Sequence, residues 1–166
     1  MCSSDLEFPE DRQRAESDVS AISALLDPLS QDFSRSPPLQ MRLGLLHAIG
    51  FNLNIAGSYE KAAAAFSTLM KLTPNDPQAN YQYGAFLAAT TRNGDGIPFL
   101  EKAKALGVLS ADYWLGMNYA VLGEKAKAVE NLESYTKGVP SDRDAARMLD
   151  AVRNDRFKVE EKKRSP

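Results

Sequence analysis

The sequence predicts an all-α protein on three observations: a glycine landmark that recurs at a nearly constant period, apolar residues at helical spacing, and no pattern typical of a strand. Gly50, Gly84 and Gly116 each lie in a short apolar segment, at separations of 34 and 32 residues. No alternating β-branched run of strand length occurs in the 166 residues. A repeat of this period is typical of proteins that stack pairs of helices.

The first helix is expected in residues 17–35, which also include a linker, after a flexible N-terminus over residues 1–16. Ser17-Asp18 is a plausible N-cap for it. The apolar residues that follow fall at helical spacing: Val19, Ile22, Leu25, Leu26 and Leu29. Ser36-Pro37-Pro38 is then expected to open the next helix, because proline is accepted in a first helical turn.

Three interpretations of the segment around Cys2 stay open. It belongs to an ordinary flexible N-terminus, or residues 1–7 are a non-native scar, since codons for Cys2 to Leu6 match the end of a sequencing adapter. In the third interpretation the chain is a mature lipoprotein that begins at a cysteine, although Met1 directly before Cys2 leaves no lipobox. The scar would imply that the true N-terminus is missing, and any export signal would be missing with it.

Further landmarks follow each glycine of the middle region. A small residue comes about twelve residues later on a second helical pattern, and a large apolar residue follows four residues after it. These pairs are Ala62 and Phe66, Gly96 and Leu100, and Ala128 and Leu132. Because glycine inside a helix costs about 1 kcal/mol against alanine, we expect the small residues, the landmark glycines included, to let two helices approach closely. The large residue of each unit is then expected to fill the space that they leave. Pro74 and Pro140 close the first and third units, since proline cannot continue a helix.

These landmarks resemble the tetratricopeptide repeat family, whose helix–turn–helix unit has about 34 residues. The repeat region is 36–142, with units at about 43–76, 77–108 and 109–142. The second unit departs most from the pattern, because Thr91 to Gly96 replaces the usual turn and no proline closes it. The resemblance implies a right-handed α-α superhelix, a helical-repeat scaffold of bacterial type.

A C-terminal capping helix is expected over residues 143–157, followed by a disordered charged tail over 158–166. Ser141 with Asp144 resembles a capping pair for this helix. Its apolar residues share one face: Ala145, Met148, Leu149 and Val152. The arginines that lie outside that face are Arg143, Arg147 and Arg153.

The resemblance also implies that the first helices of the repeats line a concave groove that binds extended peptides. Helical spacing places ten residues on that face: His47, Phe51, Asn54, Gln78, Tyr81, Gln82, Ala85, Tyr113, Trp114 and Met117. In the first unit this face is opposite to the one with Leu46, Ile49 and Leu53. The mixture of aromatic and neutral polar side chains is typical of a protein-binding surface. The competing interpretation is that the tyrosines pack on neighbouring helices with their hydroxyls in water.

The composition argues against other classes of function. Lys and Arg total 20 against 22 Asp and Glu, a net charge of −2, whereas nucleic-acid-binding surfaces usually carry a basic excess. One cysteine and one histidine exclude an internal disulfide, a multi-cysteine metal site and a two-histidine zinc site. No apolar run is long enough to span a bilayer. We expect no metal, no cofactor, no nucleic acid and no membrane span.

No catalytic constellation is recognisable, so we expect a protein that is not an enzyme. His47 has no serine or cysteine near it in a recognisable elbow, and a solvated or packing role is expected for it. Family members that clamp a C-terminal carboxylate use lysine, arginine and asparagine at positions occupied here by His47, Phe51, Gln82, Ser110 and Trp114. None of these residues is of that type, which disfavours the role of binding a chaperone tail.

The leading hypothesis is therefore a non-catalytic protein–protein interaction module that binds a peptide or protein segment in the groove. The alternative is a structural unit that self-associates, for which the apolar helix from Val19 to Leu29 is the strongest argument. A third interpretation is an appended domain of a larger protein. A cytoplasmic location is expected by default, and a periplasmic one if a leader has been lost.

Overall fold

A computed structural model describes residues 9–91 and 94–158, and in these ranges every regular element is a helix. The prediction of an all-α protein is confirmed there. The interpretations of Cys2 and most of the expected charged tail fall outside the described residues. The chain divides after Tyr83 into two compact units, 1–83 and 84–166, and each is described by itself.

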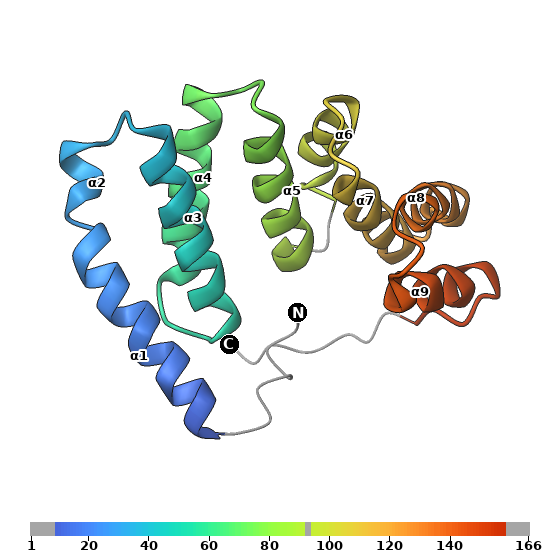
Figure 1. Ribbon diagram of the computed structural model, residues 1–166, viewed down its shortest axis with the longest axis horizontal. Helices are drawn as coiled ribbons and strands as arrows, with labels where there is room; N and C mark the ends of the chain where they lie inside the picture. Colours follow the sequence, from blue (N-terminus) through green and yellow to red (C-terminus); the bar gives the residue numbers. More distant parts are fainter. Residues whose placement is uncertain (1–8, 92–93, 159–166) are drawn as a thin grey trace. The chain divides into compact units, whose positions relative to one another are not determined.

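Over residues 9–83, the first unit contains four helices and the beginning of a fifth (Figure 1). They are α1 (Pro9–Leu26), α2 (Leu29–Asp32), α3 (Pro37–Asn52), α4 (Ser58–Leu72) and the first half of α5 (Pro77–Thr91). Helices α3 and α4 lie side by side, and α1 packs along α3. Pro37 and Pro38 open α3 as predicted, and Pro74 follows the end of α4.

The N-terminal helix begins earlier than the sequence patterns predict. Residues 9–16, expected to be flexible, form the first turns of α1, and Ser17-Asp18 lies inside the helix rather than at its N-cap. Pro9 has its torsion preset for a first helical turn, and Glu10 and Asp11 complement the positive end of the helix dipole. These local signals outweigh the scarcity of apolar residues on which the prediction rested.

Only part of the expected apolar face of α1 is buried. Val19 is 6% exposed and forms a cluster with Leu46 and Leu53, against which Ala15 and Leu26 also pack. Ile22, Leu25 and Leu29 are 44%, 72% and 40% exposed. Leu29 belongs to α2, because Pro28 interrupts the hydrogen-bonding pattern between the two helices. The predicted apolar face is therefore shared between a packed edge and an open edge.

Close approach between α3 and α4 depends on two glycines with different neighbours. A Cβ at Gly44 would lie 2.7 Å from the Phe66 ring, whereas a Cβ at Gly50 would lie 2.6 Å from the Ser58 hydroxyl oxygen. Phe66 is fully buried. The sequence pattern assigned the space beside Phe66 to Gly50, but Gly44 supplies it, because Gly50 lies at the end of α3 where α4 begins.

The second unit contains the rest of α5, then α6 (Ile97–Ala105), α7 (Ser110–Val121), α8 (Lys125–Gly138) and α9 (Arg143–Arg153). Here the glycine landmarks do what the sequence predicts. A Cβ at Gly84 would lie 2.7 Å from Leu100, and one at Gly116 would lie 2.5 Å from Leu132. Both leucines are fully buried. Gly96 precedes α6 rather than lying within it, so the second helix of that pair has only nine residues.

The last helix is amphipathic as predicted, but its limits and cap differ. Helix α9 ends at Arg153 rather than at residue 157, and its N-cap is Asp142 rather than Ser141. The Asp142 Oδ1 accepts hydrogen bonds from the backbone N–H groups of Asp144 and Ala145, at 3.0 and 2.9 Å. Ala145, Leu149 and Val152 are buried against α8, and the three arginines are exposed.

Candidate functional site

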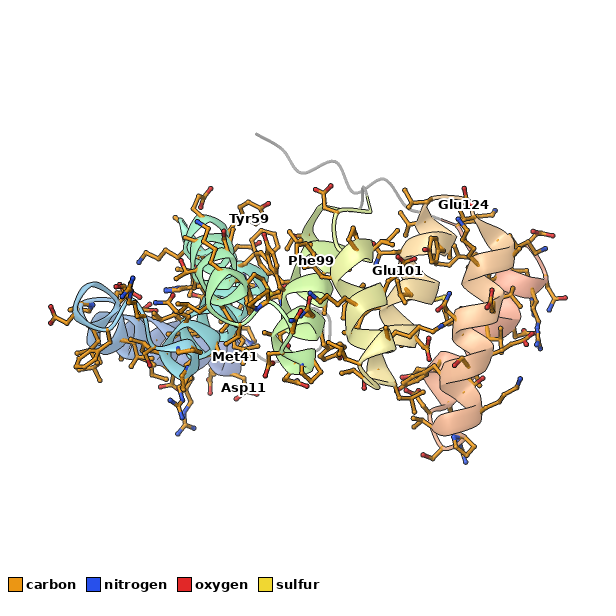
Figure 2. All side chains as sticks on the ribbon, turned by 90° about the horizontal axis from the view of Figure 1, so that it is seen from above. Asp11, Met41, Tyr59, Phe99, Glu101 and Glu124 are labelled. Atoms are coloured by element: carbon orange, nitrogen blue, oxygen red, sulfur yellow. The ribbon has the colours of Figure 1, made fainter. Side chains whose placement is uncertain are left out.

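The candidates on α3 do not form the face that helical spacing predicts. Phe51 is half-buried, with its ring centroid 5.7 Å from that of Tyr59 on α4, which Figure 2 labels. Asn54 lies beyond the end of α3, exposed and with a positive φ of 63°. Of the three candidates His47, Phe51 and Asn54, Phe51 alone occupies a partly open position on α3.

His47 is buried, so helical spacing was wrong to place it on the groove face, whereas the packing role also expected for it agrees with the structure. His47 is only 2% exposed, while Ile49, expected on the buried face, is 52% exposed. His47 Nε2 lies 2.9 Å from Asp27 Oδ1. The turn between α1 and α2 supplies this carboxylate, so the imidazole keeps a polar partner in place of water. Spacing within one helix cannot reveal which face an earlier helix will cover.

Asp27 is shared between two helices. Its Oδ2 also accepts a hydrogen bond from the Lys61 ammonium on α4, at 2.7 Å. Partial burial acts to raise the pKa of Asp27, but the hydrogen bonds and positive charge of Lys61 and His47 outweigh it, so this pKa lies below its ordinary value. The carboxylate therefore ties the α1–α2 turn to both α3 and α4.

A cavity of about 320 Å³ opens beside this cluster in the first unit. Its polar lining includes Asp27, Ser30, Gln40, His47, Lys61 and Thr68, and its apolar lining comes from α3 and α4. The hydroxyls of Ser30 and Thr68 donate to backbone carbonyls, so each oxygen can still accept a hydrogen bond. Neither Asp27 nor Lys61 was among the candidates, because their sequence separation of 34 residues hides the contact.

The candidates on α5 are distributed along the helix. Gln78 is exposed in the first turn, and Tyr81 and Gln82 are half-exposed one turn further on. All three belong to the first unit, whereas Ala85, also half-exposed, belongs to the second. Their neighbours Ala79 and Asn80 are fully buried. Helix α5 therefore keeps its predicted candidates away from its most buried face.

The candidates on α7 lie in a partly exposed aromatic cluster. The Tyr113 ring centroid is 6.0 Å from that of Trp114, edge to face, and 5.4 Å from that of Tyr135 on α8. Tyr113, Trp114, Tyr135 and Met117 are all half-exposed. The rings contact one another and stay partly exposed, because Leu115 and Tyr119 occupy the buried side of α7.

The second unit also contains a buried polar network that the sequence patterns did not reveal. Asp112 is 3% exposed, with its Oδ1 2.6 Å from the Lys104 ammonium and its Oδ2 accepting from the Ser134 hydroxyl at 2.7 Å. Lys104 also donates to Asn131 at 2.8 Å. The network links α6, α7 and α8. The sequence did not reveal it because, within each helix taken alone, these polar residues are typical of a solvent-exposed face.

Tyr119 is held by a second polar contact between α6 and α7. Its hydroxyl donates to the Glu101 carboxylate at 2.7 Å, and Figure 2 labels Glu101 on α6. Burial, together with the hydrogen bond and negative charge of Glu101, raises the pKa of Tyr119 to about 12. Tyr119 therefore stays protonated and acts as a structural donor near neutral pH.

Features of other site classes are missing from the described ranges. Within 9–91 and 94–158, no group of three or more His, Cys, Asp and Glu residues is arranged to hold a metal ion. Over the same residues, no helix combines the length and apolar character needed to cross a bilayer.

Comparison of the chain with protein-family models, curated proteins and solved structures gave no match. The class of the protein is shown by its own structure: within the described ranges it is an all-α protein built from paired helices.

Proposed function

We propose that this chain is a non-catalytic protein–protein interaction module of tetratricopeptide-like repeats, which binds an extended peptide or protein segment along the first helices of its helix pairs. The proposal is supported by helix pairs at 37–72, 77–105 and 110–138, each followed by a short turn. Gly84 and Gly116 also contact the large residue that the repeat pattern assigns to them.

The observation that carries the proposal is the aromatic cluster of Tyr113, Trp114 and Tyr135. Binding hot spots are enriched in tyrosine and tryptophan, because these rings bury a large area and lose little conformational entropy. Rings already packed on one another are partly preorganised, which lowers the cost of ordering them on binding. Met117, one helical turn beyond Tyr113, extends the surface with an adaptable apolar side chain.

Selection of the full chain against a displayed library of random peptides would test this function. Peptides selected by the wild type should bind Tyr113→Ala about 30-fold more weakly, as expected for a hot-spot aromatic worth about 2 kcal/mol. Tyr81→Ala is the corresponding change on α5. Phe157→Ala, a half-buried aromatic outside the first helices, is the matched control and should leave affinity unchanged. Failure to select any peptide, or equal binding by all variants, would contradict the proposal.

A further inference from the structure

The cavity of about 320 Å³ beside Asp27 is an elongated slot with three walls, and we call it the first-unit slot. One wall is the α1–α2 turn with the segment after it, the second is α3 and the third is α4. Each wall contributes two residues that are seven positions apart: Asp27 and Ser34, Gln40 and His47, Lys61 and Thr68. Seven residues of helix span about 10 Å, so the slot is long enough for an extended small molecule.

One end of the slot carries its formal charges. Asp27 Oδ1 lies 2.9 Å from His47 Nε2, and Asp27 Oδ2 accepts a hydrogen bond from Lys61 Nζ at 2.7 Å. These contacts use one lone pair on each carboxylate oxygen and one of the three donors of the ammonium. The Asp27 and Lys61 side chains are 30% and 53% exposed. A negative and a positive group are therefore open to a ligand side by side.

The other end of the slot is polar and carries no formal charge. Gln40 is 5% exposed, and its Nε2 donates to the Ser34 carbonyl at 3.3 Å. Among the described residues no donor reaches Gln40 Oε1, and this oxygen is not one of the sealed side-chain atoms that lack a partner. The Thr68 hydroxyl donates to the Ala64 carbonyl at 2.9 Å and can still accept. This end therefore offers acceptors to a ligand that donates a hydrogen bond.

The middle of the slot is apolar. Leu43 lies between Gln40 and His47 on α3, and Ala64 and Ala65 occupy the corresponding positions on α4. The two alanines contribute only methyl groups, which leaves room for a chain of methylene groups beside them. Along its length the slot therefore presents an ion pair, then an apolar surface, then hydrogen-bond acceptors.

We propose that the first-unit slot binds a free α-amino acid as its zwitterion, with an uncharged hydrogen-bonding side chain such as that of glutamine. The ligand carboxylate accepts from Lys61, its ammonium donates to Asp27, and the end of its side chain donates to Gln40 Oε1. The four charges then alternate in sign, so each lies beside two opposite charges. A peptide terminus carries only one of the two ligand charges, so it leaves either Asp27 or Lys61 without a counterpart. The proposal does not depend on peptide binding by the first helices.

Titration of the full chain with L-glutamine at constant pH, followed by NMR, is the first test. His47 is the single histidine and lines the slot, so its imidazole signals report binding there. Trp114, the single tryptophan, lies in the other unit and is the internal reference. L-glutamine should shift the His47 signals to saturation and leave the Trp114 indole signal in place.

Two derivatives test recognition of the zwitterion. N-acetylglutamine lacks the ammonium and glutaminamide lacks the carboxylate, so each should bind about 10-fold more weakly than L-glutamine. A His47 signal that no compound shifts up to about 10 mM overturns the proposal, and so does equal binding of the three compounds.

A lysine substitution tests the charged end. Lys61→Met should weaken L-glutamine binding about 10-fold, because it removes the donors to the ligand carboxylate and keeps an apolar side chain of similar length. Lys71→Met is the matched control, since Lys71 is exposed on the same helix but does not line the slot. The control should bind like the wild type, and equal weakening by both variants overturns the proposal.

A glutamine substitution tests the other end by comparing two ligands of similar size. The wild type should bind L-glutamine about 5-fold more tightly than L-leucine, which has no donor at the end of its side chain. Gln40→Met should abolish this preference and leave L-leucine affinity unchanged, which also shows that the variant is folded. A preference for L-glutamine that persists in Gln40→Met overturns the placement of the ligand and with it the proposal.

Discussion

The first and last helices of the described chain, α1 and α9, differ in how much of their apolar surface they bury. Each packs on the helix pair next to it and each is open on its other side. Helix α9 buries Leu149, Ala145 and Val152, and presents arginines outward. Helix α1 buries Val19 alone to below a tenth of its surface, and leaves Ile22 and Leu25 open.

The difference shows that the width of a terminal helix's apolar face decides whether its neighbouring helix can cover it. A narrow apolar stripe that matches its partner leaves mostly charged residues and no exposed large apolar side chain outside, as in α9. A wider apolar arc, as in α1, cannot be covered by a single neighbouring helix. The outer side of α9 is therefore mostly charged, whereas the outer side of α1 keeps exposed apolar side chains that favour another contact.

The largest expected effect is at the buried side of α9. Leu149→Ala should lower the free energy of unfolding by about 2–4 kcal/mol, because it removes a buried side chain and leaves a cavity. Leu25→Ala on α1 should change it by less than about 0.5 kcal/mol in the monomer, because the side chain is already in water. Urea unfolding of dilute protein measures both. Similar losses would mean that the two helices are packed alike.

The second largest effect is expected at Asp27, whose carboxylate connects the turn after α1 to α3 and α4. Asp27→Ala should lower the free energy of unfolding by about 1–3 kcal/mol, because it leaves buried His47 without its carboxylate partner. Lys61→Ala is the control: it removes only the more exposed partner, and should cost less than about 1 kcal/mol. If Lys61→Ala were as damaging as Asp27→Ala, the His47 contact would contribute little.

The third and smallest effect is at the start of α9. Asp142→Ala should lower the thermal midpoint, because two backbone donors of the first turn lose their acceptor. Ser141→Ala should leave the midpoint unchanged, since Asp142 rather than Ser141 is the cap. The opposite ranking would restore Ser141 to the capping role that the sequence suggests.

The same two carboxylates predict how stability depends on acid. Backbone hydrogen bonding from Ala145 is the main cause that lowers the pKa of Asp142, and the contacts of Asp27 with Lys61 and His47 lower its pKa against the effect of burial. A lowered pKa in the folded state stabilises the fold above the unfolded value, near 4, and this contribution is lost as the pH falls below it. Unfolding midpoints measured from pH 7 to pH 3 should decrease below about pH 4. The decrease should be smaller in Asp27→Ala and Asp142→Ala.

Local patterns predicted much of the fold because they reflect interactions within a few residues. Proline at Pro37 and beyond the ends of α4 and α8, and the glycine landmarks at Gly84 and Gly116, act on neighbouring turns or on the next helix. The start of α1 was missed because its signals, a proline followed by acidic residues, contain no apolar periodicity.

The candidate site was less predictable from sequence. Tyr81, Tyr113 and Trp114 were placed at partly open positions as expected, because their own helices determine that. The groove-face placement of His47 was wrong, although a packing role was also expected for it, because the segment that holds Asp27, twenty residues earlier in the chain, lies against this side chain. A helical spacing identifies which residues share a face, but not which face a distant segment covers.

The sequence by itself determined the helical class, the pairing of helices and some of their limits, since these follow from periodicity, proline and glycine. Tertiary structure alone decided that Gly44 rather than Gly50 faces Phe66, that Asp27 joins three segments, and that Leu25 stays open while Leu149 is buried. Such outcomes depend on the area one helix can cover on another. That area is a property of two surfaces in contact, which neither local sequence contains.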